Sequence, residues 1–455
     1  MKKILILAVV LAAIVLAFPL SNMMRSKAVD PALSAMITDP GLQELLPVLQ
    51  QKCFDCHSEN ASLPFYGSFP VAKGVIENDR QRALNYFNMT KEILSGNPVS
   101  EDALACLQKE IEEGSMPPSI YRLLHWNAGV TEAEAADIMN WIRAARAMAN
   151  SSDNADDPIY SEPLLPLVPV KGLDPDKVAL GEKLFHDTRL SGDNTVSCAS
   201  CHDLSKGGTD QAPVSTGIRG QQGPINSPTV FNAVYGLAQF WDGRARDLQE
   251  QAAGPVTNPL EMGSNWDEVL GKLQDDKEYV AAFQALYPEG MTRDSITDAI
   301  AQFEKSLVTT NSRFDRFLRG EADAMTAEEK DGYKLFKTYG CYTCHVGQAM
   351  GGQSFEKMGR LRDYFGDRGN ITGADEGRYN VTREDPDRHV FKVPSLRNIE
   401  LTFPYFHDAS AKDLNQAVTI MAKYQVDREI TEEEARLMAR FLTALTGEYE
   451  GQPLK

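Results

Sequence analysis

The motif C-x-x-C-H occurs three times in this chain of 455 residues, and it constrains the fold more than any other feature. The copies span residues 53–57, 198–202 and 341–345. Chance predicts about 0.002 copies from the seven cysteines and seven histidines present, so the repetition is not accidental. This motif attaches c-type haem: two thiols form thioethers with one porphyrin, and the adjacent histidine binds the iron.

Three covalent haems are therefore expected, and they use almost all the cysteine in the chain. The attachment cysteines are Cys53, Cys56, Cys198, Cys201, Cys341 and Cys344. The proximal iron ligands are His57, His202 and His345. A redox C-x-x-C pair or half of a zinc site is the alternative to haem attachment. Cys106 alone is left over, so one chain offers no disulfide framework.

The chain begins with two lysines and an uninterrupted apolar run over residues 4–20. The length of this run lies between that of a cleaved signal and that of a spanning helix, and both route a chain through the membrane. We favour a retained anchor over residues 1–25, because no small-x-small cleavage pattern follows, although cleavage stays open. Such an anchor would lie in the inner membrane. The positive-inside rule then keeps the two lysines in the cytoplasm and places the remainder of the chain in the periplasm, where bacteria attach c-type haem.

The net charge of −18 argues against a nucleic-acid partner, because phosphates would be repelled. A polar stretch followed by spaced prolines predicts a linker over residues 151–170. Before it we expect a monohaem cytochrome domain, 30–150. After it, the recurrence of G-x-K-L-F before the second and third motifs predicts two related haem domains, 171–320 and 321–455.

Most periodic segments are helical, including residues 131–148, 294–307 and 431–445, the last with a capping box formed by Thr431 and Glu434. Long Gly- and Pro-rich stretches between the helices would wrap the porphyrins. The expected fold class is mainly α, with tandem cytochrome c-like haem domains and long haem-wrapping loops, preceded by an N-terminal membrane helix.

Residues 223–230, 239–245, 393–398 and 404–407 resemble the bacterial dihaem cytochrome c peroxidase family, and the match covers roughly residues 171–447. The N-terminal third resembles the membrane-bound trihaem branch, the quinol peroxidases. This resemblance implies an enzyme that faces the periplasm and reduces hydrogen peroxide to water. Its electrons would come from membrane quinol or a small periplasmic carrier.

The resemblance assigns the peroxidatic haem to the second motif and the electron-relay haem to the third. Met421 matches the methionine that lies opposite His345 on the relay iron. A relative with tyrosine at that place oxidises a partner protein instead, so methionine favours a peroxidase. Without the resemblance, a core methionine on a helix face would be the simpler interpretation.

The resemblance also implies the distal pocket of the peroxidatic haem. Glu261 matches the catalytic glutamate, which would take a proton from one peroxide oxygen and return it to the other. Gln251 and Phe240 match its pocket companions, and Trp241 matches the aromatic residue between the two haems. The alternatives are a solvated loop carboxylate and an ordinary buried tryptophan.

Further ligands follow from the same resemblance. A calcium ion between the two peroxidase domains would be held by oxygen atoms of Asn226, Thr402 and Pro404. In the N-terminal domain, Met116 is expected opposite His57, with His125 as its competitor. Three other histidines are expected to be supporting or structural rather than ligating, namely His186, His389 and His407.

Many dihaem relatives carry a histidine that caps the peroxidatic iron of the oxidised enzyme. The matching position here is Ile218, which cannot bind iron. We therefore expect a peroxidatic haem that is open even when oxidised, and an enzyme active without prior reduction.

Two other interpretations stay open. The chain could be a multihaem electron-transfer protein without peroxidase activity, or a peroxidase that uses cytochrome c and not quinol. The sequence also leaves open the haem potentials, calcium occupancy and oligomeric state, although dihaem relatives are commonly homodimers.

Overall fold

The computed structural model describes residues 6, 16–24, 31–59, 61, 64–93, 99–152, 154 and 156–455. The chain divides into two compact units, 1–163 and 164–455, and each is described here by itself. The division falls within the stretch expected as a linker, and the finer domain limits remain predictions.

The described part of the first unit is built from helices without strands. The apolar sides of α3, α7 and α9 form its core, where Leu49 and Ile142 are fully buried. Thr131 and Glu134 close a capping box at the start of α9. The helices are α2 (Pro31–Met36), α3 (Pro40–Lys52), α4 (Phe54–His57), α5 (Pro70–Tyr86), α6 (Met89–Glu92), α7 (Glu101–Glu113), α8 (Ser119–Leu124) and α9 (Glu132–Ala149).

The predicted membrane anchor falls mostly outside the described residues. Residues 16–24 are helical, whereas residues 1–5, 7–15 and 25 of the expected segment are not described. Among the residues that are described, no helix combines the length and the apolar character needed to cross a membrane.

The second unit is also mainly helical, as expected, and its strands form two short antiparallel pairs. These are β1 (Phe355–Lys357) with β2 (Val390–Lys392), and β3 (Glu448–Tyr449) with β4 (Gln452–Pro453). The helices are α10 (Pro175–Phe185), α11 (Cys198–Cys201), α12 (Leu248–Thr257), α13 (Trp266–Gln274), α14 (Lys277–Leu286), α15 (Arg293–Ser306), α16 (Arg313–Leu318), α17 (Ala327–Thr338), α18 (Tyr364–Arg368), α19 (Tyr379–Thr382), α20 (Leu414–Gln425) and α21 (Glu432–Thr443).

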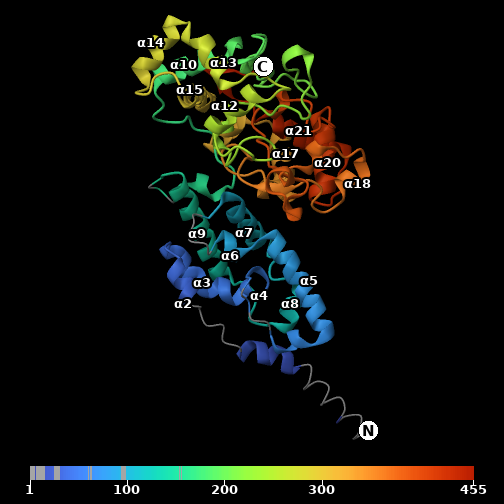
Figure 1. Cartoon of the computed structure of the whole chain (residues 1–455). Helices are drawn as coiled ribbons and strands as arrows, with labels where there is room; N and C mark the ends of the chain where they lie inside the picture. The colour runs from blue at the N-terminus through green and yellow to red at the C-terminus, as the bar shows by residue number, and fades with distance from the viewer. Residues whose placement is uncertain are drawn as a thin grey trace. The chain divides into compact units, whose positions relative to one another are not determined.

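Two similar helix pairs organise the second unit: α10 packs against α15, and α17 packs against α21 (Figure 1). Each pair meets at a glycine. A Cβ atom on Gly181 would lie 1.9 Å from the carbonyl oxygen of Ala299, and one on Gly332 would lie 2.0 Å from that of Leu437. Only glycine permits so close an approach between helix backbones. The G-x-K-L-F repeat in the sequence therefore corresponds to a repeated packing contact.

Arg397, from the segment 393–398, ties distant parts of the second unit together. Its guanidinium is fully buried and forms an ion pair with Asp315 at 2.9 Å. It also donates hydrogen bonds to the carbonyl oxygens of Leu165 and Gln348, each at 2.8 Å. A buried guanidinium is tolerated only when it is paired in this way. The segment 393–398, one of those that resemble the peroxidase family, therefore stabilises the fold through Arg397.

Candidate active site

A cavity of about 330 Å³ in the second unit gathers almost all the residues predicted to bind haem or substrate there. Cys344 is the exception: it is half-buried but does not line the cavity. The predicted residues that line it are Cys198, Cys201, His202, Asn226, Phe240, Trp241, Gln251, Glu261, Cys341, His345, Thr402, Pro404 and Met421.

Both histidines predicted to be proximal ligands in this unit have an Nδ1 contact that favours the tautomer suited to iron binding. The Nδ1 atom of His202 lies 3.3 Å from the carbonyl oxygen of Gly208, and that of His345 lies 3.2 Å from the carbonyl oxygen of Met350. An Nδ1–H donor to a carbonyl leaves Nε2 as the ligating atom. Burial lowers the pKa of His202, and it lowers the pKa of His345 to about 4, which favours the neutral ligating form.

Glu261 lies in a short turn after α12, with its carboxylate fixed and partly desolvated. The Nδ2 of Asn258 donates a hydrogen bond to its Oε1 at 2.7 Å. Burial raises the pKa of Glu261, and the opposing effects of Arg244 and Asn258 are smaller. A carboxylate with a raised pKa is a stronger proton acceptor near neutral pH.

The loop that carries Ile218 fixes the backbone of Glu261. The backbone N–H of Ile218 donates to the carbonyl oxygen of Glu261 at 2.9 Å. A Cβ atom on the preceding Gly217 would lie 2.1 Å from the carbonyl oxygen of Leu260, so only glycine fits there. The Ile218 side chain is 2% exposed, packs beside Gly263 and does not line the cavity. In this arrangement the loop supports Glu261.

Phe240 lines the same cavity in a strained conformation. Its φ of +68° lies in the left-handed region, which costs a non-glycine residue about 1–3 kcal/mol and is concentrated at functional sites. The guanidinium carbon of Arg244 lies 3.5 Å from the centre of the Phe240 ring. Beside it, Trp241 donates from Nε1 to the carbonyl oxygen of Asn226 at 2.8 Å.

The residues predicted to bind calcium offer the hard oxygen donors that this ion prefers. Asn226 is buried, and its Nδ2 donates to the carbonyl oxygen of Ala212 at 2.8 Å. Its Oδ1 accepts no hydrogen bond from any residue of the described chain. Thr402 and Pro404 line the same cavity. The donor set therefore fits the ion.

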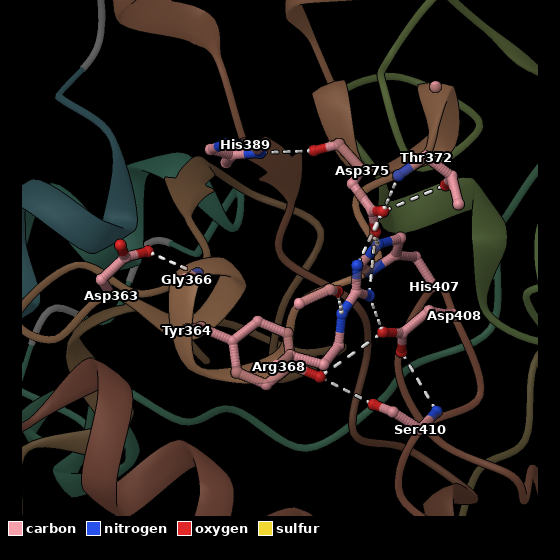
Figure 2. A network of polar contacts seen from close by, with 12 residues as sticks. Asp363, Tyr364, Gly366, Arg368, Thr372, Asp375, His389, His407, Asp408 and Ser410 are labelled. Atoms are coloured by element: carbon pink, nitrogen blue, oxygen red, sulfur yellow. Dashed lines mark hydrogen bonds and ion pairs between the residues drawn. The ribbon is translucent and has the colours of Figure 1, made fainter.

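Figure 2 shows a polar network that connects loops between residues 363 and 410. Arg368 bridges Asp375 and Asp408, and its Nη2 lies 2.7 Å from Oδ2 of Asp375. The Nε2 of His407 lies 2.7 Å from Oδ1 of Asp375, and the Nδ1 of His389 lies 2.7 Å from the carbonyl oxygen of the same residue. His389 and His407 are thus engaged by the protein.

Asp375, His407 and Asp408 present ligand-type atoms within 4.8 Å of one another. The guanidinium of Arg368 pairs with both carboxylates, however, so it supplies the positive charge that a metal ion would bring. The ring of His407 stacks on Phe391, with centroids 4.3 Å apart. This cluster is a structural brace.

The first unit has a smaller cavity of about 60 Å³ around the first motif. Cys53, Cys56, His57 and Met116 all line it, as does the leftover Cys106 on α7. The Nδ1 of His57 lies 2.8 Å from the carbonyl oxygen of Phe87, the same kind of contact that His202 and His345 make.

His125, the competitor of Met116, does not line this cavity. Its Nδ1 lies 3.0 Å from the carbonyl oxygen of Tyr121, and its Nε2 lies 3.0 Å from the hydroxyl oxygen of Tyr66. With both ring nitrogens engaged by the protein, His125 is the weaker candidate for the distal ligand.

Four residues at the main cavity escaped the sequence analysis. Gly217 acts through contacts with Leu260 and Glu261, which are distant in the sequence, so no local signal marks it. Asn258 does not line the cavity itself, and its place in an Asn-Pro turn three residues before Glu261 could have marked it. Lys392 lines the cavity, and burial lowers its pKa to about 8. Glu304 lines it from α15, and its position four residues after Ile300 on the apolar helix face could have marked it.

Comparison with known proteins places this geometry in a family. Residues 175–323 match the model described as "Di-haem cytochrome c peroxidase", and residues 11–144 match "Haem-binding domain". The cytochrome c peroxidase Ccp of Escherichia coli K12 is 43% identical over 430 residues, which cover 93% of this chain and 91% of that protein. The chain belongs to the di-haem cytochrome c peroxidase family.

Other relatives agree with this assignment. The cytochrome c551 peroxidase of Nitrosomonas europaea is 47% identical over 289 residues, covering 63% of this chain and 85% of that protein. The crystal structure of a MauG-like protein associated with microbial copper homeostasis aligns with a TM-score of 0.55 and 29% identity, covering 62% of this chain and 93% of the other. The chain is therefore an enzyme, a peroxidase that depends on haem. Its mainly helical fold is MauG-like.

Proposed function

We propose that this chain is a membrane-anchored trihaem peroxidase that faces the periplasm and reduces hydrogen peroxide to water. The observation that carries the proposal is Glu261, a half-buried carboxylate with a raised pKa in the cavity that also contains His202. A protein that only relays electrons needs no carboxylate placed to take a proton from a bound peroxide and return it to the departing oxygen.

Bound to the second motif, a haem would supply an iron open to peroxide and the electrons that cleave its O–O bond. Glu261 would accept the proton from the peroxide oxygen nearer the iron and donate it to the departing oxygen. Asn258 keeps the carboxylate oriented through its 2.7 Å hydrogen bond. Gln251 and Phe240 would complete the distal wall, since both line the cavity beside Glu261.

Electron delivery would use the third motif and Trp241. Met421 on α20 lines the cavity together with His345, which supports methionine as the sixth ligand there. Trp241 is fixed by its hydrogen bond to Asn226, a residue of the proposed calcium site. Calcium binding would therefore reinforce the position of the tryptophan between the two haem sites.

The first unit would receive electrons from the donor. His57 and Met116 line its cavity, and a His/Met haem has a higher potential than a bis-histidine one, which suits electron entry from quinol. The apolar run over residues 4–20 supports an inner-membrane location close to a quinol pool. A small periplasmic cytochrome is the alternative donor, favoured by the net charge of −18, which would attract a basic carrier. A homodimer is part of the same proposal, from the family resemblance alone.

Glu261→Gln tests the peroxidase assignment. The purified holoenzyme should keep its haem content, yet turnover of peroxide with an artificial donor should fall by about 10²- to 10⁴-fold, because the amide cannot accept the proton. Glu278→Gln is the matched control, since Glu278 is exposed on α14 and does not line the cavity. Activity of Glu261→Gln equal to that of the control would contradict the role of Glu261.

A further inference from the structure

The two helix pairs of the second unit establish a residue-by-residue correspondence. The Cβ that Gly181 lacks would lie 2.8 Å from the Cβ of Phe303, and the one that Gly332 lacks would lie 2.9 Å from the Cβ of Phe441. Since the contacts with Ala299 and Leu437 match in the same way, α15 and α21 are in register with an offset of 138 residues.

This register pairs Glu304 with Leu442. The residues four positions earlier, Ile300 and Met438, are paired as well, and all four line the haem cavity. The position therefore faces the cavity in both halves of the unit. The half with the third motif has leucine there, which shows that this fold does not require a carboxyl group at the position.

Glu304 is deeply buried without a complete set of partners. The residue is 4% exposed, and its Oε2 is inaccessible and has no hydrogen-bond partner within the described chain. An unpaired buried polar atom is costly, so a carboxyl group kept at such a place needs a reason. Glu304 lines the same cavity as Cys198, a haem-attachment residue, and its negative charge contributes, after burial, to the raised pKa of that thiol. Glu304 thus belongs to the haem site of the second motif.

Burial alone raises the pKa of Glu304 to about 8. Several charged or titratable side chains lie on the elements packed against α15, including Lys177 and Glu182 of α10, Glu250 of α12, and Tyr235. None of them contributes to the raised pKa of Glu304. Lys177 instead pairs with Asp298. Formation of the thioether would remove the ionisable thiol of Cys198 and leave Glu304 as an isolated acid beside the porphyrin.

We propose that Glu304 couples one proton to the redox state of the haem on the second motif. Its carboxyl group takes up a proton from solvent when that haem gains an electron, and releases the proton when the electron leaves. The electron comes from the donor through the relay haem. Because one proton accompanies each electron, the net charge of the buried pocket is unchanged. A change of net charge in a low-dielectric site is costly, and this coupling avoids it.

Leu442 gives the relay haem no such group, so the two haems of the unit should differ in their response to pH. The inference rests on the proposed assignment of the second motif to the peroxidatic haem. Reduction potentials are measured without peroxide, however, so loss of peroxidase activity and loss of proton coupling are separate observations.

The test is an EPR-monitored potentiometric titration of the holoenzyme and of Glu304→Gln, Glu304→Leu and Leu442→Glu, over roughly pH 6 to 9, which brackets the value of about 8. In the wild type, the potential of the second haem should be independent of pH below the pKa of Glu304 in the oxidised protein. Above that pKa, uptake of one proton per electron lowers the potential by about 59 mV per pH unit, which is a factor of ten in the equilibrium constant. Glu304→Gln and Glu304→Leu should flatten this slope and leave the other two haems unchanged. Leu442→Glu should introduce a slope at the third haem.

A wild-type slope that survives in Glu304→Gln would overturn the proposal and leave Glu304 as a structural, water-bridged carboxylate. If the variants fail to mature, a redox-induced infrared difference spectrum of the wild type with isotopically labelled glutamate decides the question. The spectrum is recorded above pH 8, where the carboxyl group of the oxidised protein is ionised. A labelled, protonated carboxyl signal that appears on reduction supports the coupling, and its absence contradicts it.

Discussion

Gly217→Ala should disable the enzyme by displacing Glu261, although Gly217 itself carries no reactive group. The added Cβ would lie 2.1 Å from the carbonyl oxygen of Leu260 and 2.8 Å from the Cα of Glu261. Ordinary contacts begin at about 3.4 Å, so the first pair must separate by about 1.3 Å. The φ of Gly217 is −90°, so the substitution adds no left-handed backbone strain.

A displacement of about 1 Å at a reacting group can lower turnover by about 10²-fold, and that is the loss we expect in kcat. The overpacking should lower the free energy of unfolding by about 1–3 kcal/mol. The assay is steady-state peroxide reduction with an artificial donor, corrected for haem content. Gly223→Ala is the matched control in the same loop, because its new Cβ would lie 3.8 Å from the nearest atom, the carbonyl oxygen of Ser215.

Equal kcat values for Gly217→Ala and Gly223→Ala would refute the reasoning, since the loop would then not determine the position of Glu261. A loss of haem in Gly217→Ala would be seen separately in the absorbance of the purified protein.

Three further predictions concern other parts of the molecule. Glu261 must be ionised to act as a base, and burial raises its pKa above the ordinary value of 4.5. As the pH is lowered, kcat/KM should therefore begin to fall while the pH is still above 4.5. Glu261→Gln should not show this fall. Asp375→Asn should lower the free energy of unfolding in urea at neutral pH by about 1.5–3 kcal/mol, because Arg368 loses one of its two carboxylate partners and keeps Asp408. Burial would raise the pKa of Asp375, but hydrogen bonds from Arg368 and Thr372 outweigh it and lower that pKa. The ionised Asp375 therefore stabilises the fold at pH values above 3.8, the pKa of the unfolded chain, and this stabilisation is lost as the pH falls below 3.8. The unfolding free energy of Asp375→Asn should lack this dependence on acid. Deletion of residues 1–25 should release a protein that reduces peroxide with an artificial donor but couples poorly to quinol in membranes, and undiminished quinol activity would make the anchor incidental.

The sequence predicts the chemistry of this protein better than its geometry. The three C-x-x-C-H motifs have fixed spacing, so the order of residues along the chain is enough to infer haem attachment. The mainly helical fold was also predictable, and the capping box of Thr431 and Glu434 is confirmed at the start of α21. These features are local, and local patterns survive in a linear sequence.

Contacts between distant segments could not be predicted in the same way. Gly217 matters because a loop approaches the backbone of Glu261, more than forty residues away in the chain. Arg368 and Asp375 form a brace with His407 that no short motif encodes. Glu304 and Leu442 occupy equivalent positions because the two helix pairs pack in the same way, and this equivalence depends on contacts between helices that are distant in the sequence.

The spectrum of the fully oxidised protein tests most directly the claim that the second motif holds an open, peroxide-reactive haem. With Ile218 in place of a capping histidine, EPR should show about one third of the haem as high-spin, since one of three haems would lack a strong sixth ligand. Peroxide added to this resting protein should react at once. Three low-spin haems, with a lag until the protein is reduced, would contradict the account.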